Sequence, residues 1–121
     1  MSREISKLHE EKVADILKMI DCSAEKVKNS GACDFNDGDV KFTAGLVECK
    51  TMKESQKQQT IKKEDLEKID EEAFRSGSGL EMGIMSINFG DLMGKEYFII
   101  QEDDFINIMY AYLKEEGYID G

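Results

Sequence analysis

Residues 38–51 read GDVKFTAGLVECKT, and this stretch predicts two paired strands that carry charged side chains among apolar ones. Its first half alternates polar and apolar residues, which is typical of a half-buried strand, and Ala44-Gly45 allows a tight connection. The second half places Glu48 and Lys50 two residues apart, so both project from one face of a strand. Because adjacent strands lie roughly 5 Å apart, we expect Asp39 on the first strand to face Glu48.

Asp39, Glu48 and Lys50 together predict a metal-dependent hydrolytic site. Neighbouring carboxylates repel each other, a divalent cation removes the repulsion, and hard Mg²⁺ prefers oxygen ligands. A lysine beside them supplies positive charge to the transition state of phosphodiester hydrolysis. The alternative is an edge hairpin whose polar face is only solvated. Glu48 argues against that alternative, because a charge inside an otherwise apolar run needs a partner.

The segments on either side of the hairpin predict the rest of the fold. Hydrophobic periodicity and turn residues predict helices at 3–20, from 61 or 62 to about 75, and at 102–115, with strands at 26–28, 38–43, 46–51, 80–89 and 97–100. The order α-β-β-β-α-β-β-α predicts an α/β (α+β) protein with a central mixed sheet flanked by helices. The length of the chain and the lack of a long linker predict a single domain over residues 1–121.

Each expected helix has an apolar face that we expect to pack on the sheet. These faces comprise Ile5, Leu8, Val13, Ile16, Leu17 and Ile20 in the first helix, Leu66, Ile69, Ala73 and Phe74 in the second, and Phe105, Ile108, Met109 and Tyr112 in the third. Further core residues are expected to be Cys49, Met82, Met85, Met93 and Met109.

Two polar residues of the first helix also lie near its apolar face. Glu10 borders that face and is the helix residue best placed to reach a site at the sheet, although an ordinary surface glutamate is the alternative. His9 lies on the face itself and is expected to be a buried, hydrogen-bonded histidine without a catalytic role.

Composition favours a cytoplasmic protein. The chain has 121 residues, 40% of them hydrophobic, and no apolar run near the ~20 residues that cross a bilayer. The N-terminus lacks the apolar stretch of a secretory signal. Three cysteines without paired spacing argue against a disulfide scaffold and for a reducing compartment.

The net charge of −10 argues against nucleic-acid binding, but the charge is unevenly distributed. Residues 41–63 contain six lysines and two glutamates, a net +4, whereas the rest of the chain carries −14. Neutralisation of phosphates is the main source of DNA affinity. We therefore expect phosphate contacts from Lys53, Lys57, Lys62 and Lys63, with simple solvation of these lysines as the alternative.

Three stretches of the chain resemble the PD-(D/E)XK nuclease superfamily. They are Gly38-Asp39-Val40, Leu46-Val47-Glu48-Cys49-Lys50-Thr51 and Thr60-Ile61-Lys62-Lys63-Glu64-Asp65-Leu66. Within that superfamily the chain is similar to the small Holliday-junction-resolvase-like proteins of phages and prophages, over nearly its whole length. Gly38 stands where the family name has its proline.

The resemblance implies a restriction-endonuclease-like core and a Mg²⁺- or Mn²⁺-dependent endonuclease. It implies that Asp39 and Glu48 bind the metal with the backbone carbonyl of Cys49, that Lys50 orients or activates water, and that Glu10 completes the site. It further implies a homodimer that cuts branched DNA during recombination, in a bacterial or phage-infected cytoplasm.

Two other functions remain open from the sequence. A nuclease with the same core could act on duplex ends, flaps or a specific site. A non-catalytic protein could bind DNA or imitate its charge with its many carboxylates. Lys50 favours catalysis over mimicry, because it places a positive charge among the key acids.

Overall fold

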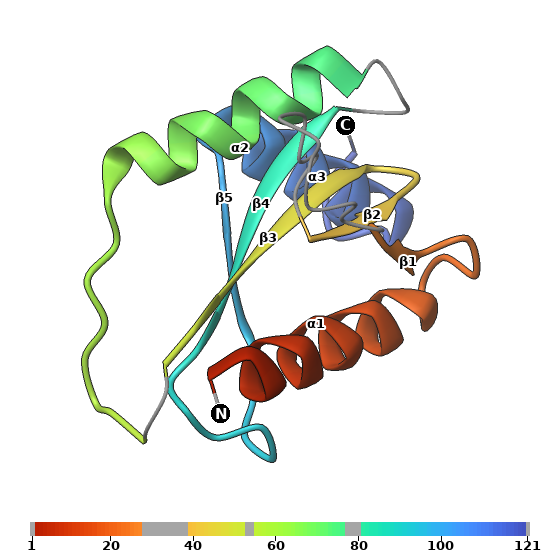
Figure 1. Ribbon diagram of the computed structural model, residues 1–121. Helices are drawn as coiled ribbons and strands as arrows, with labels where there is room; N and C mark the ends of the chain where they lie inside the picture. The colour runs from red at the N-terminus through yellow and green to blue at the C-terminus, as the bar shows by residue number, and fades with distance from the viewer. Residues whose placement is uncertain (1, 28–38, 53–54, 77–80, 121) are drawn as a thin grey trace.

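The computed structural model describes residues 2–27, 39–52, 55–76 and 81–120, and its elements follow the predicted order (Figure 1). These elements are α1 (Ser2–Lys18), β1 (Glu25–Lys26), β2 (Val40–Phe42), β3 (Gly45–Thr51), α2 (Lys63–Ser76), β4 (Met82–Asn88), β5 (Tyr97–Ile100) and α3 (Glu102–Glu115). The α+β class and the order α-β-β-β-α-β-β-α are therefore confirmed. Among the described residues, none of the helices has both the length and the apolar character to span a bilayer.

The five strands form one mixed sheet in the order β1-β2-β3-β4-β5. β3 and β4 pair in parallel along their full lengths, and the other neighbours are antiparallel. Gly45 makes the start of the parallel pair possible, because a Cβ there would overlap the backbone carbonyl of Met82. Parallel strands need a long crossover, and the chain between β3 and β4 supplies it through α2.

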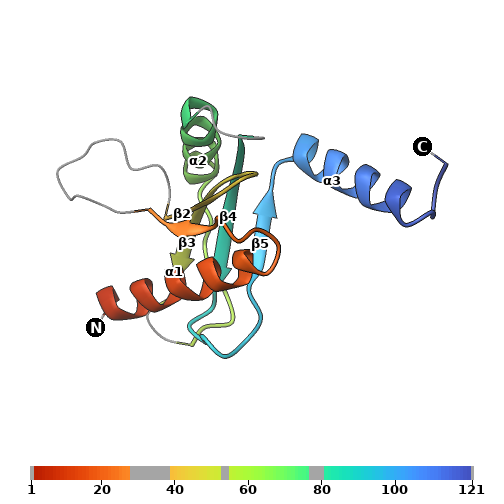
Figure 2. The ribbon, with the colours of Figure 1, turned by 90° about the vertical axis from the view of Figure 1, so that its right-hand side faces the viewer.

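Helices α1 and α2 cover opposite faces of the sheet (Figures 1 and 2). The alternation of side chains along β3 decides which residue meets which helix. Val47 packs with Val13 and Leu17 of α1. On the other face Leu46 packs with residues of α2 in a second buried cluster, completed by Ile69 and Ala73.

Strand β4 is the centre of this arrangement. All seven of its residues are buried, as the almost continuous apolar run predicts for a strand covered on both faces. Gly83 lets α2 approach closely, because a Cβ there would overlap the backbone of Asp70. Met82 and Met85 of this strand are core residues, as predicted, but Met93 is exposed in the turn that follows.

The predicted apolar faces of α1 and α2 are only partly correct. Leu8 is half exposed, and Ile20 lies beyond the end of α1 and is exposed. Phe74 is 72% exposed, so its expected place in the core is wrong. Phe74 is one position, or about 100°, from Ala73, and the side that carries Ile69 and Ala73 is the one that meets the sheet.

The prediction that α3 packs on the sheet is wrong. Its boundaries match the sequence, but no residue of α3 is buried, and the face expected in the core is exposed. That face consists of Phe105, Ile108, Met109 and Tyr112. Figure 2 shows α3 extending away from the sheet and its two covering helices.

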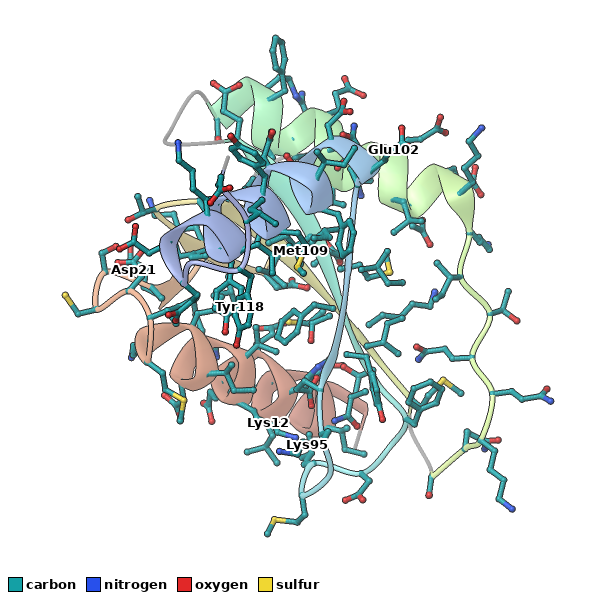
Figure 3. The ribbon with its side chains drawn as sticks, turned by 180° about the vertical axis from the view of Figure 1, so that it is seen from behind. Lys12, Asp21, Lys95, Glu102, Met109 and Tyr118 are labelled. Atoms are coloured by element: carbon teal, nitrogen blue, oxygen red, sulfur yellow. The ribbon has the colours of Figure 1, made fainter. Side chains whose placement is uncertain are left out.

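A buried polar cluster joins α1 to the sheet and to the turn before β5. His9 is fully buried, as predicted, and its ring nitrogens lie 2.6 Å from Thr51 Oγ1 and 2.6 Å from Glu96 Oε1. Lys12 donates to the carbonyl of Gly94, 2.6 Å away, and Figure 3 shows Lys12 beside the turn that carries Lys95. The cluster holds the N-terminal helix against the end of the sheet nearest Thr51.

Candidate active site

Asp39 and Glu48 come together at the junction of β2 and β3. The antiparallel register pairs Val40 with Val47, and the backbone N–H of Asp39 donates to the Val47 carbonyl at 2.8 Å. The Asp39 carboxylate accepts the backbone N–H of Cys49 at 2.7 Å. The carboxyl groups of Asp39 and Glu48 hydrogen bond to each other. The two acids therefore face each other, as the strand spacing predicts.

Burial and mutual repulsion control the protonation of this acid pair. Burial raises the pKa of Glu48 to about 8, with a further contribution from the negative charge of Asp39. Burial also raises the pKa of Asp39, against the opposing effect of the Cys49 N–H. Without a cation, Glu48 therefore keeps a proton near neutral pH and shares it with Asp39.

Lys50 projects from the same face of β3 as Glu48. The two side chains line one cavity of about 150 Å³ on the α2 side of the sheet, together with Asp65. Lys50 Nζ lies 3.8 Å from Asp65 Oδ2, and the lysine side chain remains partly exposed. The cavity thus has one member of the acid pair, Glu48, and the ammonium group of Lys50 in its lining.

Helix α2 contributes three charged residues that the sequence analysis overlooked. Asp65 and Lys68 line the cavity, and the positive charge of Lys68 lowers the pKa of both Asp39 and Glu48. Glu72 is buried, lies 3.9 Å from Lys68 through its carboxylate, and raises the pKa of Glu48. A signal was present, because the spacing i, i+3, i+7 puts all three on one helix face.

Glu10 approaches the acid pair from the other face of the sheet. Burial and the charge of Asp39 raise its pKa, which shows that the two carboxylates are close enough to repel each other. Its carboxylate also lies 4.0 Å from Lys26 Nζ. Its role as a further ligand stays a prediction.

Cys49 turns its side chain away from the acid pair. The thiol packs against the α1 core, as predicted, and burial raises its pKa so that it stays protonated. The thiol is therefore a poor ligand for a hard ion. Only the backbone carbonyl of Cys49 matches the predicted role, which stays a prediction.

Of the four lysines expected to contact DNA, the three that the structure describes do not line the cavity. Lys53 lies outside the described residues, and Lys62 and Lys63 are exposed at the start of α2. Lys63, two residues before Asp65 in α2, lines a second groove of about 210 Å³. Lys57 is exposed in the segment before α2 and lines a wide, open hollow of about 560 Å³.

The donor atoms of the acid pair suit a hard divalent cation. Mg²⁺ is commonly held by one or two carboxylates, with water and substrate phosphate completing its shell. Asp39 and Glu48 provide those two carboxylates. Within the described ranges, no group of three or more His, Cys, Asp or Glu side chains converges on one ion position. The pair fits an ion that takes its remaining ligands from water and substrate.

The site is thus an acid pair, two lysines and a small cavity between β3 and α2. Glu48 and Lys50 come from the strand, and Lys68 comes from the helix. The chain matches no protein-family model, no curated protein and no solved structure.

Proposed function

We propose that this protein is a Mg²⁺- or Mn²⁺-dependent DNA endonuclease that acts on branched DNA such as a four-way junction. The observation that carries the proposal is the acid pair of Asp39 and Glu48, whose Glu48 member lines the same small cavity as Lys50. Paired carboxylates with a nearby ammonium group match the needs of phosphodiester hydrolysis.

The metal would be held by Asp39 and Glu48, with the Cys49 carbonyl and Glu10 as proposed further ligands. When bound, Mg²⁺ supplies a Lewis acid that lowers the pKa of water and offsets phosphate charge. Lys50 donates to a phosphate oxygen and orients the attacking water. The water oxygen forms a new bond to phosphorus and gives up a proton to solvent as the bond from phosphorus to the 3′ oxygen breaks, and that oxygen takes up a proton. The products are a 5′-phosphate and a 3′-hydroxyl.

Lys50 and Lys68 flank the cavity from two different elements. Asp65 holds the Lys50 ammonium at 3.8 Å and thereby keeps it at the cavity rim. Lys68 adds a second positive charge on the α2 side. Two cations around one phosphate would stabilise the extra negative charge of the transition state.

The size of the cavity supports a polymeric substrate. Pockets that enclose a small molecule usually measure roughly 300–1,000 Å³, whereas this cavity measures about 150 Å³. It has room for a phosphate group, with the rest of the substrate outside. A nucleic-acid backbone that extends from the cavity over Lys62 and Lys63 fits a cavity of this size. The proposed location is the cytoplasm, where such DNA is available.

A non-catalytic DNA- or protein-binding role is the second candidate. The observation in its favour is the ion pair between Lys50 and Asp65, which occupies the ammonium group that catalysis requires. A nuclease of the same type acting on flaps, duplex ends or a specific site is a further alternative. These functions differ in cleavage, metal dependence and substrate.

The deciding experiment compares a four-way junction with a linear duplex of the same arm sequence, in Mg²⁺ and in chelator. We expect metal-dependent cleavage of the junction that is lost in Glu48→Gln and Lys50→Ala. Two exposed control positions, Glu71→Gln on α2 and Lys18→Ala on α1, should retain activity.

Equal residual cleavage by the wild type and both site variants would contradict the nuclease proposal. Junction binding without cleavage in that experiment would favour the binding role. Metal-dependent cleavage of the linear duplex at the same rate would keep the nuclease and reject its preference for branched DNA.

A further inference from the structure

Helix α3 carries its apolar side chains away from the rest of the chain. It begins directly after Gln101, which follows β5, and Figure 2 shows it extending into solvent. No residue of α3 is buried, and the main packing contacts among the described elements do not involve it. No described element therefore covers this helix.

The apolar surface of α3 is wider than a single helix face. Seven apolar side chains project from it, namely Phe105, Ile106, Ile108, Met109, Tyr110, Tyr112 and Leu113. At 3.6 residues per turn they span about 200° of the circumference. Phe105 is 53% exposed and Tyr112 is 54% exposed. An exposed surface of this kind marks an interaction site.

The charges of α3 argue against a lipid bilayer as its partner. Its first turn carries Glu102, Asp103 and Asp104, and Lys114 is the basic residue of its last turn. Helices that lie on membranes usually carry Lys and Arg on their polar face, because they bind anionic lipids. The acidic first turn would be repelled by such lipids, so the helix fits a protein partner better.

The large side chains of α3 form a pattern that complements itself. Phe105 and Tyr112 lie at equal distances on either side of a point between Ile108 and Met109. All four residues fall within about 100° of the circumference. In an antiparallel pair of such helices, each Phe105 meets Tyr112 of the second copy, and each Ile108 meets Met109. A two-fold interface requires one patch to fit itself in this way.

The apolar area that α3 and the residues after it expose is close to the area that one partner buries in a stable dimer. Exposed fractions and ordinary side-chain areas give on the order of 800 Å² of apolar surface per copy, from α3 with Tyr118 and Ile119 after it. A standard interface buries about 800 Å² per partner. Figure 3 shows Met109 and Tyr118 along this part of the chain.

We propose that α3 is the contact between two copies of this chain, with the helices packed antiparallel around Ile108 and Met109. The second copy would cover the face formed by Phe105, Ile108, Met109 and Tyr112. This pairing does not depend on the nuclease function, because it uses none of the residues that line the acidic cavity.

Sedimentation equilibrium of the full chain tests the proposal. We expect a concentration-dependent mass of two chains, and Ile108→Asp should raise the dissociation constant at least about tenfold, as loss of a central contact does. Asn107→Asp is the matched control, because residue 107 lies on the polar side of α3 and should leave the constant unchanged. Circular dichroism should show that both variants keep the fold, since α3 takes no part in the main packing contacts among the described elements.

A second pair of variants tests the geometry. Phe105→Asp and Tyr112→Asp should weaken pairing equally, because these residues meet across the interface. A wild type that remains one chain at every soluble concentration would overturn the proposal. So would a monomer that sediments with phosphatidylcholine vesicles through α3. A larger effect from Ile106→Asp than from Phe105→Asp would overturn the antiparallel register.

The two proposals fail separately. Glu48→Gln should abolish cleavage and leave the dimer intact. Dimerisation with no cleavage by the wild type would reject the nuclease and keep the α3 contact.

Discussion

Asp39 and Glu48 share a hydrogen bond between their carboxyl groups across two neighbouring strands. Two buried acids in this position hold a proton more tightly than they do in the unfolded chain. The pair is therefore a source of instability once the proton is lost. A divalent cation can take the place of that proton, which links metal binding to the stability of the fold.

The stability of the metal-free protein is expected to fall as pH rises. The pKa of Glu48 rises from 4.5 to about 8 on folding, so its stabilising effect is complete below its unfolded pKa and is lost as pH rises through its folded pKa. Glu48→Gln should flatten this decline, because the amide stays neutral. Thermal unfolding across this pH range provides the measurement, with each kcal/mol shifting the midpoint by roughly 4 °C.

Added Mg²⁺ should raise the unfolding temperature more above pH 8 than near pH 6, since protons then compete less with the cation. The control is Glu71→Gln, an exposed position on α2 that should follow the wild type. An identical pH dependence of the unfolding temperature in wild type and Glu48→Gln would show that ionisation of the acid pair does not control how stability changes with pH.

Lys68 is expected to support cleavage as a second cation of the cavity. Lys68→Ala should lower the rate of junction cleavage by roughly 10–100-fold, the effect of losing one hydrogen bond to a charged group. Lys68→Arg should recover part of the loss, because it keeps the positive charge. Single-turnover kinetics separates this effect from DNA binding, and full activity in Lys68→Ala would remove Lys68 from the site.

Lys62 and Lys63, exposed just before and at the start of α2, are expected to bind DNA phosphates. Removing both should weaken binding and reduce the slope of log K against log salt by about 0.9 for each lost contact. Fluorescence anisotropy at several salt concentrations measures that slope, and Lys18→Ala serves as the exposed control. A weaker affinity with an unchanged slope would mean that the two lysines do not contact phosphates.

The pairing of His9 with Glu96 is expected to stabilise the fold and not the chemistry. Burial opposes ionisation of Glu96, but hydrogen bonds from Lys12 and Asn88 and the charge of His9 hold its pKa below the ordinary value. Its side chain is 1% exposed. Breaking a buried pair by removing one partner costs roughly 3–5 kcal/mol.

His9→Ala should therefore unfold at a much lower urea concentration than the wild type and should retain metal-dependent cleavage at low temperature. Glu48→Gln should show the opposite behaviour, with loss of cleavage and a stable fold. A stable but inactive His9→Ala would instead assign His9 to the catalytic site.

The local elements and one face of the candidate site could be predicted from the sequence. The alternation around Glu48 and Lys50 places them on the face opposite Val47, as expected of any strand. The apolar run of β4 also predicts its burial on both faces. These features depend only on backbone periodicity, which short stretches of sequence express directly.

The partners of the site required the tertiary structure. Lys68 and Glu72 lie more than fifteen residues from Lys50, and only the crossover through α2 brings them to the acid pair. Helix α2 packs closely at Gly83 with Ile69 and Ala73 toward the sheet, and this rotation leaves Phe74 exposed. A hydrophobic pattern alone does not decide between two rotations of the helix that differ by one residue, or about 100°.

Periodicity alone identified α3 and its apolar residues, but it did not show what they face. Phe105 and Tyr112 belong to an apolar helix face, and an apolar face has the same sequence pattern whether it packs in a core or in an interface. The direction in which the chain leaves β5 decides between the two, because it carries α3 beyond reach of its own sheet. Local sequence thus determines which surfaces must be buried, whereas the path of the chain determines what can bury them.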